Sequence, residues 1–194
     1  NSAINEFTNK QFNAASTDII VKNAGISKGA LFQYFGTKKN LFFYIYKYAF
    51  DILKKELWEQ LDLSITDPLE RIKSVLTIKM KLLSKYPNLI NFILNINLRE
   101  TDPEIKEMVE KDTNIQKEKT FYDILAGVDY SKLKKEFEPK QIIAVIIWVL
   151  EGYANSQMQK LKNENITITS YEQWEKEINQ YINILKISFY EEEK

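Results

Sequence analysis

The stretch from Ser16 to Leu41, STDIIVKNAGISKGALFQYFGTKKNL, constrains the fold most, because it holds two short helical patterns separated by a glycine. Ile20 and Ala24 are four residues apart, so they fall on one face of a first helix. Gly25 follows where the chain must turn sharply, since glycine tolerates a positive φ. The pattern predicts a helix that ends in a tight turn.

A second short helix is predicted directly after the turn, and Ser27 is a good N-cap for it. Three of its side chains are expected to point inward: Leu31, Tyr34 and Phe35. The outer surface is expected to carry Lys28, Gly29, Ala30, Phe32 and Gln33. A helix of about two turns with a small, polar front suits a recognition helix, whose first residues meet base edges in the major groove of DNA.

The run from Ala24 to Leu41, AGISKGALFQYFGTKKNL, resembles the signature of TetR/AcrR-type transcriptional regulators. That signature has an Ala-Gly turn, Ser-Lys-Gly, a Leu-aromatic-x-Tyr-Phe block, and a Lys-containing helix start before Leu. The resemblance implies an all-α fold with an N-terminal three-helix helix-turn-helix head and a larger helical ligand-binding and dimerisation domain. We expect the DNA-binding domain at residues 1–48, with its first helix truncated at Asn1, and the effector-binding and dimerisation domain at 49–194.

The resemblance also indicates which residues meet DNA. Lys28 and Gln33 are expected at guanine and adenine edges, and Ala30 at a thymine methyl group. Side chains at helix N-termini and around the motif are expected to hold phosphates. The predicted DNA-binding residues are Ser16, Thr17, Ser27, Lys28, Gly29, Ala30, Phe32, Gln33, Tyr34 and Lys38. Phe32 stands where the family more often has Tyr, and Gln33 where His is common.

Charge is unevenly distributed along the chain. Residues 1–48 contain six lysines against Glu6 and Asp18, a net charge of +4, while the whole chain has a net charge of zero. A basic head on an acidic remainder is typical of nucleic-acid binding. The alternative is chance clustering of lysines on a solvated face.

Composition excludes several kinds of site. The chain has no Cys and no His, which excludes disulfides, imidazole zinc sites and His-based catalytic triads. We predict no metal, no cofactor and no enzyme activity. The longest apolar run, 142–150, is far shorter than the ~20 residues of a membrane span. With no visible signal peptide, a cytoplasmic protein without membrane contact is expected.

The long helix after Thr37 and the last two helices of the chain have apolar faces that call for partners. Thr37 is expected to cap a long helix with one stripe formed by Leu41, Ile45, Ala49, Ile52 and Leu53. A second side of that helix would carry Phe43, Phe50 and Leu57, so the helix would link two bodies. The last two helices carry more apolar surface than one monomer covers, which predicts a homodimer. The alternative is that they lie centrally in a monomer core.

A small-molecule effector is expected in a pocket of the middle helices. The predicted lining residues are Met80, Phe92, Ile96, Phe121, Tyr122, Trp148 and Glu151. Such a lining would take a hydrophobic or aromatic molecule. The alternative is that aromatic residues at helical spacing only pack the core.

These observations predict a ligand-responsive repressor that binds a pseudo-palindromic double-stranded operator as a homodimer and is released by a small hydrophobic effector. The rival prediction is a helical protein-binding adaptor without sequence-specific DNA binding. Salt distinguishes the two, because binding to phosphates weakens steeply as salt rises.

Overall fold

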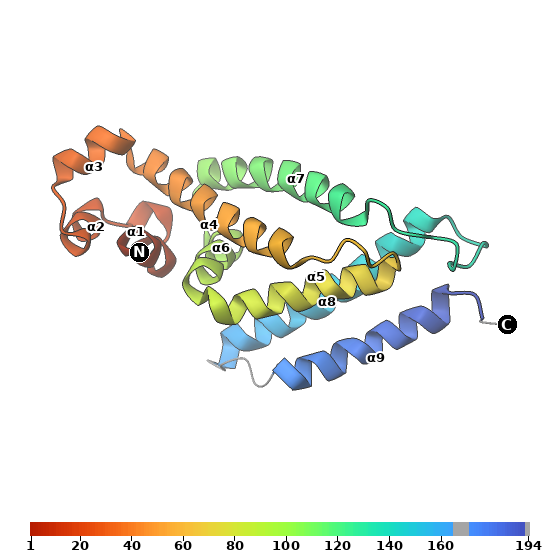
Figure 1. The fold of residues 1–194 in the computed structure, drawn as a ribbon. Helices are drawn as coiled ribbons and strands as arrows, with labels where there is room; N and C mark the ends of the chain where they lie inside the picture. The colour runs from red at the N-terminus through yellow and green to blue at the C-terminus, as the bar shows by residue number, and fades with distance from the viewer. Residues whose placement is uncertain (165–170, 193–194) are drawn as a thin grey trace. The chain divides into compact units, whose positions relative to one another are not determined.

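The computed structural model describes residues 1–164 and 171–192. The elements of secondary structure in these residues are helices, and none is a strand. The elements in chain order are α1 (Ser2–Asn9), a 3-10 helix η1 (Phe12–Ala14), α2 (Thr17–Ala24), α3 (Lys28–Phe35), α4 (Lys38–Gln60), α5 (Pro68–Lys85), α6 (Pro87–Arg99), α7 (Pro103–Leu125), α8 (Pro139–Glu164) and α9 (Tyr171–Phe189) (Figure 1). The predicted all-α fold is confirmed.

Local chemistry sets where the helices begin. The chain's four prolines are the first residues of α5, α6, α7 and α8, positions where no backbone N–H is needed. Thr37 caps α4, because its Oγ1 accepts a hydrogen bond from Asn40 N at 3.0 Å. Asp67 and Asp102 cap α5 and α7 in the same way, at 2.9 to 3.0 Å.

The chain folds into two compact units. Unit 1 comprises Asn1–Gln60 and Lys81–Phe121, and unit 2 comprises Leu61–Met80 and Tyr122–Lys194. Helices α5 and α7 each contribute residues to both units. The predicted boundary between 48 and 49 concerns which part binds DNA and which binds an effector, and it stays a prediction.

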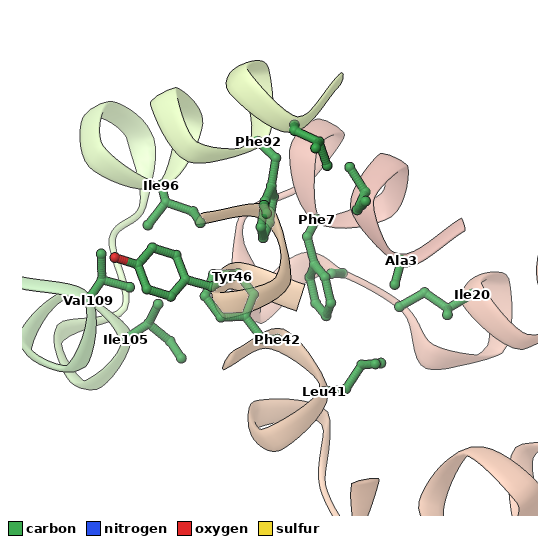
Figure 2. Packing of buried hydrophobic residues seen from close by; sticks show 14 of the residues in the cluster. Ala3, Phe7, Ile20, Leu41, Phe42, Tyr46, Phe92, Ile96, Ile105 and Val109 are labelled. Atoms are coloured by element: carbon green, nitrogen blue, oxygen red, sulfur yellow. The ribbon is translucent and has the colours of Figure 1, made fainter. Parts of the chain in front are cut away.

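Aromatic rings form the centre of unit 1 (Figure 2). Phe42 of α4 meets Phe7 of α1 edge-on at 5.0 Å between ring centroids, and Phe92 of α6 at 5.7 Å. Tyr46 joins them from α4. The other labelled members are Ala3, Ile20, Leu41, Ile96, Ile105 and Val109. The core of the N-terminal helices is therefore completed by residues of α6 and α7.

The buried face of α4 differs from the predicted stripe. Phe42 and Tyr46, which the stripe omits, are 1% and 2% exposed, whereas Ile45, Ile52 and Leu53 are half-buried. Because α4 carries apolar side chains on several sides, periodicity alone does not select one face. The helices that pack on it, α1 and α6, select the face with the large rings.

The core of unit 2 joins α5, α8 and α9. Leu69, Ile146 and Ile178 are at most 1% exposed and represent the three helices. At the start of α5, the Tyr190 hydroxyl donates to Asp67 Oδ1 at 2.8 Å. This bond fixes the end of α9 to the cap of α5.

Arg71 of α5 is fully buried in unit 2. Its guanidinium donates three hydrogen bonds to backbone carbonyl oxygens: from Nε to Ile65 at 2.7 Å, from Nη1 to Ile124 at 2.8 Å and from Nη2 to Leu63 at 2.6 Å. The side chain thus ties the segment before α5 to the last turn of α7.

Candidate nucleic-acid interface

The α2–turn–α3 pair is built by local hydrogen bonds. Gly25 ends α2 in the left-handed region, with φ 68° and ψ 30°, and the N–H of Ile26 donates to the Val21 carbonyl oxygen at 3.1 Å. Ser27 then caps α3, its Oγ accepting from Ala30 N at 3.1 Å. The glycine turn and the serine cap expected from the sequence are both present.

The two faces of α3 differ from the prediction at two positions. Leu31 is buried, and Phe32 and Phe35 pack half-buried on the core of unit 1, so these three share the inner face. Tyr34, expected inward, is 87% exposed. Phe32, which was expected to face outward, is turned toward the core. The two-turn helix buries only one face, and Phe32 lies on it beside Leu31 and Phe35. The remaining predicted residues of α3 and its cap are exposed: Ser27, Lys28, Gly29, Ala30 and Gln33.

The lysines at this surface have different environments. Lys28 Nζ lies 2.9 Å from Asp18 Oδ1, and both side chains are more than half exposed. Lys38, predicted to hold a phosphate, donates to the carbonyl oxygens of Ala15 at 3.0 Å and Asn13 at 3.3 Å. Its ammonium group also lies 4.6 Å from the centroid of the Phe12 ring. These contacts hold η1 against the start of α4.

The start of α2 is tied to α1. Ser16 and Thr17 are half-buried, and Ser16 Oγ accepts from Ile19 N at 3.4 Å. The Ser16 N–H donates to Glu6 Oε1 at 2.9 Å. The N–H of Ser16 is therefore already occupied by the Glu6 carboxylate. A phosphate at this helix N-terminus would meet the N–H groups of the residues that follow Ser16.

A family comparison identifies this arrangement. Residues 1–45 match the family of bacterial regulatory proteins of the TetR type. The N-terminal segment has the sequence pattern of that family. The resemblance seen in the run from Ala24 to Leu41 is thereby confirmed. The whole chain also has the fold of TetR-family regulators.

Solved structures extend this likeness over the whole chain. A TetR family transcriptional regulator from Chloroflexus aurantiacus J-10-FL superposes with a TM-score of 0.66 at 18% identity, covering 98% of this chain and 91% of that one. The ketosteroid transcriptional regulator KstR2 of Mycobacterium tuberculosis gives 0.58 at 17% identity, with 98% and 92% covered. SCO4942 of Streptomyces coelicolor, a putative transcriptional regulator, gives 0.53 at 16%, with 97% and 94% covered.

A buried carboxylate that the sequence did not single out holds the N-terminal helices to the corner between α6 and α7. Glu100 is 5% exposed, and its Oε2 accepts from the N–H of Phe12 at 2.8 Å. Its Oε1 accepts from the N–H groups of Thr101 and Asp102, both at 2.9 Å. A neighbouring link runs from Asn95 Nδ2 to the Thr8 carbonyl oxygen at 2.9 Å. A glutamate in a polar stretch of sequence gives no signal of this role.

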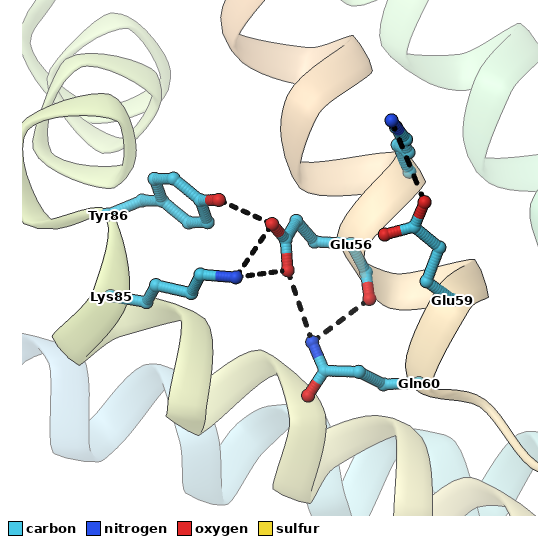
Figure 3. Close-up of polar contacts among 6 residues, drawn as sticks. Glu56, Glu59, Gln60, Lys85 and Tyr86 are labelled. Carbon is cyan, nitrogen blue, oxygen red and sulfur yellow. Dashed lines mark hydrogen bonds and ion pairs between the residues drawn. The ribbon is translucent and has the colours of Figure 1, made fainter.

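A second polar cluster joins α4 to the junction of α5 and α6 (Figure 3). The carboxylate of Glu56 accepts from Lys85 Nζ at 2.8 Å and from the Tyr86 hydroxyl, while Gln60 Nε2 donates to the Glu56 carbonyl oxygen at 3.0 Å. The hydrogen bonds from Lys85 and then Tyr86 lower the pKa of Glu56. The same contacts raise the pKa values of Lys85 and Tyr86.

The predicted effector residues lie in different environments. Phe92 and Ile96 are core residues of unit 1, whereas Met80 packs on the core of unit 2. The exposed ones are Tyr122, Trp148 and Glu151. The side chain of Phe121 lies outside the described residues. The effector pocket stays a prediction.

Other binding features are modest in the described part of the chain. A hollow of about 180 Å³ in unit 1 is lined by Gln11, Asn95 and Glu100, among others, and is smaller than the roughly 300 Å³ at the lower end for ligand pockets. Among the side chains that the structure describes, no group of three or more acids is placed to hold a metal. None of the described helices has the length and apolar character needed to cross a bilayer.

Proposed function

We propose that this chain is a transcriptional regulator that binds a pseudo-palindromic operator as a homodimer, with α3 in the major groove. The observation that carries the proposal is the exposed front of α3 on a head that matches the TetR family. Lys28 and Gln33 offer the donors and acceptors that read guanine and adenine. Tyr34, at 87% exposure, is free of the core and suits a phosphate contact.

Exposed apolar side chains on the last two helices support the homodimer. Ile184 and Ile187 of α9 are 58% and 80% exposed, and Trp148 of α8 is 70% exposed. Tyr181 lies three residues before Ile184 and so shares its face of α9. Large apolar side chains gathered on an exposed surface mark protein interfaces. A second copy of the chain, offering the same surface, would cover them.

We further propose that a small hydrophobic molecule releases the DNA, so that the regulator is a repressor. The support is the apolar and aromatic character of the predicted lining residues, which select such ligands. The test adds hydrophobic and aromatic small molecules to the protein–operator complex. A compound that lowers operator affinity supports repression by release, and one that raises it points to activation.

The deciding experiment is fluorescence anisotropy with duplexes from the intergenic DNA upstream of the chain's own gene, at about 50 and about 200 mM salt. Wild type is compared with Lys28→Ala, Tyr34→Ala and a control, Lys140→Ala, at an exposed lysine of α8. We expect sequence-selective, salt-sensitive binding that both head variants weaken and the control keeps. Absent or salt-insensitive binding would favour the protein-binding adaptor.

A further inference from the structure

The ion pair between Asp18 and Lys28 lies on the surface that the proposed function turns toward DNA. Asp18 is in the first turn of α2, and Lys28 is the first residue of α3. Lys28 Nζ is 2.9 Å from Oδ1 and 3.1 Å from Oδ2, so it contacts both carboxylate oxygens. The side chains are 70% and 53% exposed for Asp18 and Lys28, respectively. A negative charge therefore accompanies the lysine expected to read bases.

This carboxylate is placed differently from the other acid in the head, because it is exposed and pairs with a cation of α3. Residues 1–48 contain two acidic side chains, Glu6 and Asp18. Glu6 is half-buried and accepts from Ser16 N at 2.9 Å, which ties α1 to α2. Asp18 is exposed and engages a cation instead. Because the side chain of Asp18 is exposed, packing does not explain its position at the front of the helix pair.

The physical chemistry of DNA binding gives such a pair two effects. A lysine gains affinity from phosphates of any sequence, and a carboxylate beside it cancels part of that gain. At base edges, lysine donates to guanine O6 and N7 while a carboxylate accepts from cytosine N4. An A·T pair lacks guanine's two adjacent acceptors, and its thymine O4 acceptor stands where a G·C pair presents cytosine N4, so it repels a carboxylate there. Proteins often discriminate between a correct and an incorrect partner by placing a group that repels the incorrect one.

We propose that Asp18 is a specificity-determining residue: it holds Lys28 back from the phosphates of non-target DNA and favours a G·C pair at the position that Lys28 reads. The inference deepens the proposed function and rests on it. Asp18 is thus expected to lower the affinity for random DNA more than the affinity for the operator.

The test selects binding sites from a random duplex library with wild type, Asp18→Asn and Asp51→Asn. Asp51 is an exposed acid of α4 in the same unit, so its variant removes the same charge elsewhere. Affinities are then measured on the selected site and on a scrambled duplex. Asp18→Asn is expected to bind the scrambled duplex about fivefold more tightly, the scale of one exposed charge pair. Its G·C preference should relax by a similar factor, and Asp51→Asn should match wild type.

Two further variants test whether the effect of Asp18 depends on Lys28 and on the negative charge, and whether it reflects a loss of folding. In a Lys28→Ala background, Asp18→Asn should have almost no additional effect, because the lysine it restrains is gone. Asp18→Glu keeps the charge at the start of α2 and should keep wild-type selectivity, with melting temperature as the check on folding.

Several results would overturn the inference. Unchanged selectivity in Asp18→Asn, an equal effect of Asp51→Asn, or an undiminished effect without Lys28 would each refute a role for Asp18 through Lys28. Relaxed selectivity in Asp18→Glu would show that the charge is not the determinant. If wild type itself selects no sequence, the proposed function fails first, and that outcome is distinct from the others.

Discussion

Removal of the Glu100 carboxylate tests how the head is held in unit 1. The side chain is 5% exposed and satisfies three backbone N–H groups, those of Phe12, Thr101 and Asp102, at 2.8 to 2.9 Å. Each buried donor left without a partner costs about 1–3 kcal/mol. Water can reach part of the corner once the side chain is cut back, so we expect Glu100→Ala to lose about 2–4 kcal/mol of unfolding free energy.

Glu100→Gln should lose less, about 1–2 kcal/mol, because the amide oxygen still accepts while its NH₂ group faces a donor. The assay is urea unfolding, combined with hydrogen exchange at the Phe12 amide, which should lose protection in both variants. Glu107→Ala, at an exposed glutamate of α7, is the matched control and should stay within about 0.5 kcal/mol of wild type. The reasoning is refuted if Glu100→Ala behaves like this control, or if Phe12 keeps its protection.

Three other outcomes are expected. Arg71→Met should lower the unfolding free energy by about 2–4 kcal/mol in urea titrations, since three carbonyl oxygens lose a charged donor; an unaffected midpoint would contradict this. The pKa of Glu56 in the folded protein lies below the ordinary value of 4.5. The stabilisation that Glu56 contributes is therefore complete above pH 4.5 and is lost as the pH falls through the lower folded pKa. Wild type should therefore lose stability below about pH 4.5 more steeply than Glu56→Gln, with Glu59→Gln on the same helix keeping the wild-type slope. Ile187→Glu, at 80% exposure, should shift the mass measured by light scattering from dimer to monomer without lowering the helical content, and a monomeric wild type would refute the dimer.

Features with local causes were predictable from the sequence. Gly25 and the caps Ser27 and Thr37 are present as predicted, because each depends on partners within a few residues. A hydroxyl or carboxylate at a helix start meets the N–H groups of the following turn whatever the rest of the chain does. The all-α fold and the helix-turn-helix follow from such local rules.

Features with distant partners were not predictable. Glu100 and Phe12 are 88 positions apart, and no periodicity connects them. The ammonium group of Lys38 meets carbonyl oxygens 23 and 25 positions earlier, a contact that the local sequence pattern does not indicate. The exchange of Tyr34 and Phe32 has the same origin, since the core that α3 packs against includes residues far along the chain. The candidate effector residues belong to more than one packing environment, which spacing along single helices does not show.

The composition of unit 1 has a consequence for engineering. The ring of Phe42 packs against those of Phe7 and Phe92, and the turn before η1 is anchored by Glu100, so α6 and its corner complete the interior of unit 1. A chimaera made by exchanging residues 1–48 alone would separate that interior from the residues that complete it. A transplant that carries Lys81–Phe121 along with Asn1–Gln60 would keep that interior whole in a new sensor.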